Sequence, residues 1–122
     1  MTDVKEMMKR LEEVQDQIAE RSLVLVAGDG STEEVLVRIG RPYLFPGYDE
    51  YIWAYEIVGG GIQEGRFGAG EDSVGALVMC LQFIGTRVHV LRDRFGGRLN
   101  WPGNPDDPDC GFPRFPKQTR KD

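Results

Sequence analysis

Histidine and cysteine, the side chains that most often bind zinc, are scarce in this chain. There is one histidine, His89, and there are two cysteines, Cys80 and Cys110. No Cys-x-x-Cys pair occurs, and no histidine lies at ligand spacing from either cysteine, so the sequence carries no signature of a zinc site or a disulfide framework. We expect no metal and no cofactor, and a reducing, cytoplasmic compartment.

Long hydrophobic runs are also lacking. No stretch approaches the ~20 apolar residues of a membrane helix, and the charged amino terminus does not resemble a secretory signal. The net charge of -5 argues against a protein that binds nucleic acid by neutralising phosphates. We therefore expect no membrane and no nucleic-acid partner.

The 122 residues are 40% apolar and 29% charged, which predicts one folded domain spanning residues 1–122. The charge is unevenly distributed. Residues 1–64 carry 13 acids and 6 bases, whereas residues 65–122 carry 7 acids and 9 bases. This asymmetry predicts an acidic side towards the amino end, suited to a basic partner.

Hydrophobic periodicity predicts a helix over about 3–20, in which Val4, Met7 and Leu11 recur at helical spacing. The Met7-Met8 pair is interpreted mainly as core packing, with a soft partner-binding face as the alternative. A sheet is predicted over about 22–68. Its strands are 22–27, 34–39, 51–58 and 62–67, with an Asp29-Gly30 turn joining the first two.

A second helix is predicted over about 73–92, with Asp72 as its cap. Gly85 leaves an alternative open, in which the helix stops there and residues 87–91 form a strand. Residues 93–122 are rich in glycine and proline and predict an irregular tail. The fold class is therefore α+β: an amino-terminal helix, a four-stranded antiparallel meander, and a second helix on the same sheet face, followed by the tail.

Three patterns that resemble functional motifs favour plainer interpretations. The glycines from Gly59 to Gly70 lack the spacing of a nucleotide-binding loop and fall between two strands. His89 and Asp93 are four residues apart, but no nucleophile is placed beside them, so a catalytic histidine is the minor alternative. The carboxylates of residues 106–109 lack the pattern of a calcium loop and favour a solvated turn.

The segment 41–48 is the most unusual part of the chain, because a strand connection contains three aromatic residues and a leucine. Exposed apolar loops are often contact surfaces. The alternative, that this loop is a lid over the core, stays open. The candidate binding residues are Arg41, Tyr43, Phe45, Tyr48 and Glu50.

Several short motifs resemble a family of small bacterial proteins that is catalogued as a domain of unknown function. They are residues 38–42 (Arg-Ile-Gly-Arg-Pro), Asp72-Ser73 before Ala76-Leu77, Leu99-x-Trp101 with Gly103, and Gly111-Phe112-Pro113. The likeness covers roughly residues 21–115. It implies a bacterial, cytoplasmic, one-domain protein, and by analogy a partner of other proteins, as immunity proteins are.

The hypothesis is a non-catalytic protein-interaction module, immunity-like or regulatory, that acts on a basic partner. The alternative is a domain for an anionic small molecule, enzymatic or not, with Arg38, Arg41, Tyr43 and Trp53 around a pocket at one sheet end. A purely structural subunit of a homo-oligomer is a weaker third option.

Two further expectations concern the tail and the thiols. Trp101 and residues 111–113 should anchor the tail, with proteolysis near residues 117–121 and none at Arg98. Cys80 should be buried and Cys110 more accessible, with no disulfide between them.

Overall fold

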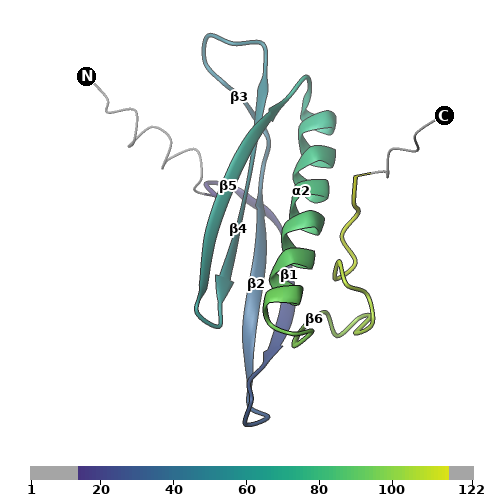
Figure 1. Cartoon of the computed structure of the whole chain (residues 1–122). Coiled ribbons are helices and arrows are strands. Elements are labelled where there is room, and N and C mark those ends of the chain that lie inside the picture. Colours follow the sequence, from purple (N-terminus) through teal and green to yellow (C-terminus); the bar gives the residue numbers. More distant parts are fainter. Residues whose placement is uncertain (1–13, 116–122) are drawn as a thin grey trace, which may run out of the picture.

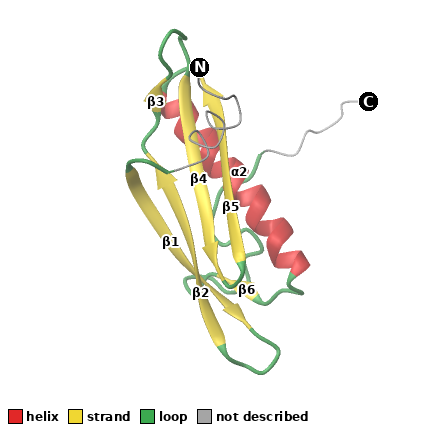
Figure 2. Cartoon of the chain, turned by 90° about the vertical axis from the view of Figure 1, so that its left-hand side faces the viewer, coloured by secondary structure: helices red, strands yellow, loops and turns green. Residues whose placement is uncertain are grey.

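Four long strands follow one another in chain order across a single antiparallel sheet, and one helix covers one face of it (Figures 1 and 2). The computed structural model describes residues 14–115. The elements are β1 (Gln17–Val26), β2 (Thr32–Gly40), β3 (Tyr43–Leu44), β4 (Tyr51–Gly59), β5 (Ile62–Gly70), α2 (Ser73–Arg94) and β6 (Leu99–Asn100). The predicted α+β class, with an antiparallel sheet and a helix packed on it, is confirmed.

The long strands pair as β1–β2, β2–β4 and β4–β5, which is the predicted meander. Two short strands that were not predicted extend it. β3 continues the line of β2 and pairs with the start of β4, and β6 pairs with the free side of β1.

Local turn chemistry fixes both hairpins. In the first, the Asp29 carboxylate accepts hydrogen bonds from the backbone N–H and the hydroxyl of Ser31, at 2.9 and 2.6 Å. In the second, Gly60 and Gly61 have φ values of +59° and +82°. This left-handed pair is the conformation that a two-residue hairpin turn requires, and glycine adopts it without strain.

The predicted amino-terminal helix is wrong where the structure describes it. Residues 17–20 belong to β1, whose ladder with β2 runs on to Gln17 opposite Gly40, and residues 14–16 are not helical. Cross-strand pairing has overridden a helical pattern that helix propensity alone supports weakly. The remainder of that predicted helix, from residue 3 to residue 13, lies outside the described residues.

The helix α2 runs unbroken through Gly85, so the alternative strand at residues 87–91 is wrong. The Asp72 carboxylate caps it by accepting from the Gly75 N–H at 2.6 Å. A Cβ added at Gly85 would lie 2.2 Å from the carbonyl oxygen of Pro113. Gly85 therefore admits the tail against the helix, and the helical hydrogen bonds continue past it.

The core lies between α2 and one face of the sheet. Alternate residues of the strands point into it, including Val35 and Val37 of β2 and Ile57 of β4, and α2 contributes Cys80 and Ile84. The other face of the sheet, here called the outer face, carries no helix within residues 14–115 (Figure 2).

The tail crosses α2 on the side away from the sheet and is held by one arginine (Figure 1). The Arg21 guanidinium lies 4.0 Å from the ring centroid of Trp101 and 4.8 Å from that of Phe112. It also donates to the Cys110 carbonyl at 3.0 Å. The Asp107 carboxylate accepts from the N–H groups of Asp109 and Gly111, which closes the tail's turn.

This packing confirms the predicted anchoring by Trp101 and Phe112, and it corrects the expectation for Cys110. Both thiols are free and fully buried. Burial raises the pKa of Cys80 to about 12 and that of Cys110 to about 11. Cys110 is not the more accessible thiol, because the folded tail carries it into the core cluster, where Arg21 binds its backbone carbonyl.

Opening of the tail should expose Cys110 and leave Cys80 covered. We expect Arg21→Met to raise the rate of Cys110 labelling about tenfold, because it removes a hydrogen bond and two cation–π contacts that together are worth about 1.5 kcal/mol. Cys80 is the internal control. Equal acceleration of both thiols, measured by mass spectrometry after timed labelling, would show global loosening and refute the local clamp.

The ion pair between Arg87 and Glu64 joins α2 to β5, with both side chains partly buried. Hydrogen bonds from Arg87 hold the pKa of Glu64 below its ordinary value of 4.5. A depressed folded-state pKa adds stability above the unfolded-state pKa, and this stability is lost as the pH falls through the folded-state value.

We therefore expect Glu64→Gln to lower the free energy of unfolding at pH 7. Its difference from the wild type should shrink as the pH falls below 4.5. Urea unfolding of both proteins measures this difference. The titrations are done at neutral and at acid pH, with the protein concentration held fixed. A difference that stays constant across this range would assign the effect to packing rather than to the carboxylate charge.

Candidate functional site

The loop between β2 and β4 is an ordered hairpin end. β3 pairs with the start of β4, Tyr43 opposite Ile52. Beyond it the Phe45 N–H donates to the Glu50 carbonyl at 2.9 Å, and the Tyr48 N–H donates to the Phe45 carbonyl at 3.1 Å. Gly47, at φ +84°, makes the tight reversal that brings residues 45 and 48 together.

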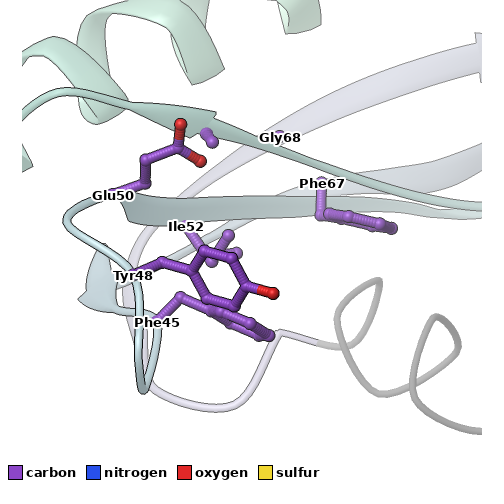
Figure 3. A pocket seen from close by; sticks show the side chains of 7 residues that line it. Phe45, Tyr48, Glu50, Ile52, Phe67 and Gly68 are labelled. Carbon is purple, nitrogen blue, oxygen red and sulfur yellow. The ribbon is translucent and has the colours of Figure 1, made fainter.

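Phe45 and Tyr48 form a pair of tilted rings with centroids 5.1 Å apart. Figure 3 shows them beside Ile52, with Phe67 on the neighbouring strand and Glu50 at the rim. These side chains surround a hollow of about 270 Å³, here called the loop hollow, which is lined by Phe45, Tyr48, Glu50, Ile52, Phe67, Gly68 and Ala69.

The loop hollow lies on the outer face of the sheet. In β4, Ile52 alternates with Trp53, and in β5, Phe67 and Ala69 alternate with Gly68, whose partner across the strands is Trp53. Trp53 belongs to the core under α2, so Ile52, Phe67 and Ala69 point the other way. This apolar outer-face patch is continuous with the aromatic loop.

An acidic hollow adjoins the loop hollow across Tyr48. It measures about 460 Å³ and is lined in part by Asp49, Glu50 and Glu71. None of these carboxylates forms an ion pair within the described part of the chain. An apolar concavity therefore lies beside three carboxylates that have no ion-pair partner within residues 14–115.

The five residues expected to form the site are only partly brought together. Phe45, Tyr48 and Glu50 line the loop hollow. Tyr43 lies outside its lining in β3, where burial raises its pKa. Arg41 forms an ion pair with Asp16 at 2.7 Å, in which both side chains are about two-thirds exposed.

The sequence did not point to the strand residues that line the loop hollow, in particular Ile52 of β4 and Phe67 of β5. The signal was present in β4, whose residues 51–55 are apolar without alternation. A strand of that kind has apolar side chains on both faces. The second face was the one to which no helix had been assigned.

The residues of the anionic-ligand alternative do not converge. Arg38 is opposite Glu56 in β4 and forms ion pairs with Glu20 and Glu56. Trp53 is three positions before Glu56 in the same strand, so it points to the opposite face. The charge of Arg38 is therefore already paired with two carboxylates, and Trp53 lies on the other face of the sheet, so the two side chains do not form one anion site.

His89 serves to attach the tail. Its Nδ1 lies 2.9 Å from a carboxylate oxygen of Asp109, and its Nε2 lies 3.6 Å from Asp93. Arg114 approaches the same Asp109 oxygen at 3.7 Å. Within residues 14–115, no three side chains of histidine, cysteine, aspartate or glutamate gather closely enough to hold a metal ion.

Comparison with known proteins gives a family without an assigned activity. No curated protein and no solved structure matches the chain. A family model described as "Domain of unknown function (DUF6968)" matches residues 19–114, a span that holds the whole sheet from Ala19 on, α2 and the anchored tail. The chain therefore belongs to the DUF6968 family.

Proposed function

We propose that this protein is a non-catalytic interaction module that binds a partner protein at the loop hollow. The observation that carries the proposal is the pair of aromatic rings, Phe45 and Tyr48, standing over an open apolar concavity with acidic groups at its rim. Tyr48 is 62% exposed, and the neighbouring Leu44 is 54% exposed.

Aromatic side chains at such a surface supply large contact area for little loss of conformational entropy. The loop hollow would accept an aliphatic or aromatic side chain of the partner. The three carboxylates next to it would favour basic residues flanking that side chain, and would speed the encounter more than they raise the affinity. The partner is therefore a basic protein with an exposed apolar anchor.

Loss of the ring at position 48 should weaken binding without weakening the fold. We expect Tyr48→Ala to reduce partner affinity by about 1 to 3 kcal/mol, the usual cost of removing an aromatic anchor, and to change stability by no more than about 0.5 kcal/mol. Leu44→Ala is the matched control, because Leu44 is equally exposed and lies outside the loop hollow.

The wild type, Tyr48→Ala and Leu44→Ala are each used to capture partners from a lysate of the native host. The captured protein is then titrated against each variant to measure its affinity. The wild type and Leu44→Ala should retain one stoichiometric partner that Tyr48→Ala loses. Retention of the same partner by all three proteins would count against the loop hollow. A large fall in the melting temperature of Tyr48→Ala would make the loop a lid over the interior.

The acidic rim should act mainly on the association rate. We expect Glu50→Gln to slow association with the captured partner several-fold at low salt, with little change at high salt, because screening removes the attraction in both proteins. Glu33→Gln, at the opposite end of the sheet, is the control. Stopped-flow binding at two salt concentrations tests this, and an unchanged rate at low salt would remove the rim from the proposal.

A further inference from the structure

Within residues 14–115, the strand β5 at the far edge of the sheet has a strand on one side only. β5 pairs with β4 over nine residues, and its other side faces no strand within the described residues. The two-residue turn makes Gly59–Ile62 a hydrogen-bonded pair, so every second pair after it is also hydrogen-bonded. The backbone groups of Gln63, Gly65, Phe67 and Ala69 therefore point outwards to the free edge.

These outward groups are almost without partners. Among the described residues, the only hydrogen bond to one of them comes from Arg66, whose guanidinium folds back onto the Gly65 carbonyl at 2.9 Å. A long edge with unpaired N–H and C=O groups is a template for another strand. Two charged side chains lie at its middle: Glu64, whose carboxylate is bound by Arg87 of the same chain, and Arg66, which is exposed.

The charge pattern of this edge is complementary to itself. Glu64 and Arg66 flank Gly65. If a second β5 runs antiparallel about a two-fold axis at Gly65, each Glu64 lies opposite the other copy's Arg66, and Gln63 lies opposite Phe67. A shift of the axis by one residue would place Glu64 opposite Glu64 or Arg66 opposite Arg66, and like charges directly opposite are destabilising.

A second, independent feature lies beside the same edge on α2. Met79, Phe83 and Val90 recur at helical spacing and line a hollow of about 450 Å³ between α2 and β5. Phe83 is 41% exposed even with Phe115 packed edge-on against it, and Val90 is 42% exposed. Contrary to the sequence-based expectation that no stretch approaches a membrane helix, α2 is long and apolar enough to cross a membrane by length and composition, and 33% of its most apolar stretch is buried.

Pairing of the two edges would cover this helical stripe. α2 packs on both β4 and β5. With the two β5 strands about 4.8 Å apart, the two α2 axes would lie about 10 Å apart, the distance at which helices pack. The apolar stripes would then face each other across the two-fold axis.

We propose that the occupant of this edge is a second copy of the chain, joined through antiparallel β5–β5 pairing centred on Gly65 and packing of the two α2 stripes. The interface shares Phe67 of β5 with the lining of the loop hollow, whereas Phe45, Tyr48 and Ile52 lie outside the paired edge. The dimer would thus present two partner-binding surfaces.

The test compares the full-length chain with two pairs of matched variants, by light scattering and sedimentation from about 1 to about 100 µM. The wild type should reach twice its chain mass of 13.7 kDa. Gln63→Pro removes an outward N–H that faces Phe67 of the other copy, whereas Ala69→Pro removes an equally outward N–H that would face only the hairpin turn. Val90→Lys charges the stripe, whereas Val78→Lys charges a valine that is 47% exposed and points about 120° away around α2.

We expect Gln63→Pro and Val90→Lys each to raise the dimer dissociation constant at least about tenfold, since each acts twice across the two-fold axis. Ala69→Pro and Val78→Lys should leave the dimer dissociation constant within about twofold of the wild-type value.

Continued protection of Cys80 from labelling shows that each variant is folded. A monomeric wild type overturns the proposal. So does a dimer that persists in both Gln63→Pro and Val90→Lys. So does a dimer that Ala69→Pro weakens as much as Gln63→Pro does. The loop-hollow variant Tyr48→Ala should dimerise normally, so failure of either proposal is visible without the other.

Discussion

The packing of α2 against one face of the sheet is the contact on which the rest of the structure depends. A single helix covers the strands from one side, and its buried stripe of Ala76, Cys80, Ile84, Val88 and Leu91 closes the core with the alternate residues of β2 and β4. One helix cannot bury both faces of a sheet. The loop hollow lies on the face that this helix does not cover, and the stripe of Met79, Phe83 and Val90 lies on the part of the helix beside the β5 edge.

The tail completes the core beside α2, where its residues 101–112 pack at Arg21 of β1. Because Gly85 has no side chain, the Pro113 carbonyl lies against α2, and Phe112 and Cys110 reach the interior. Arg21 reaches from β1 to stack on Trp101 and bind the tail backbone. Residues 101–113, which form neither helix nor strand, are thus held by Arg21 of β1 and by contact with α2 at Gly85.

The two surfaces left by this arrangement differ in chemistry. The outer face near the loop offers an apolar concavity beside acidic groups, which suits a basic partner with an apolar anchor. The β5 edge offers backbone hydrogen-bonding groups and opposite charges about a glycine, which suit a strand of the same sequence. Each of these two surfaces is the basis of one of the two binding proposals.

The sequence alone determined the structural features that depend on residues close together in the chain, namely turns, the buried face of a strand and the start of a helix. The Asp29-Gly30 and Gly60-Gly61 turns set the two hairpins, so the antiparallel order of the four long strands was predictable. The alternation of β2 determined its buried face, and Asp72 determined the start of α2. Phe45 and Tyr48 were proposed as site residues because aromatic residues are unusual in a strand connection, and Glu50 was proposed as their acidic neighbour; all three line the loop hollow.

Tertiary contacts decided what the sequence left open or suggested wrongly. Pairing with β2 made residues 17–20 a strand although their spacing favoured a helix, since a ladder of hydrogen bonds outweighs a weak propensity. The passage of the tail across Gly85 and the burial of Cys110 depend on residues far apart in the chain. The joining of Ile52 and Phe67 to the aromatic loop likewise needed the strand register, because a one-residue shift would have turned both side chains into the core.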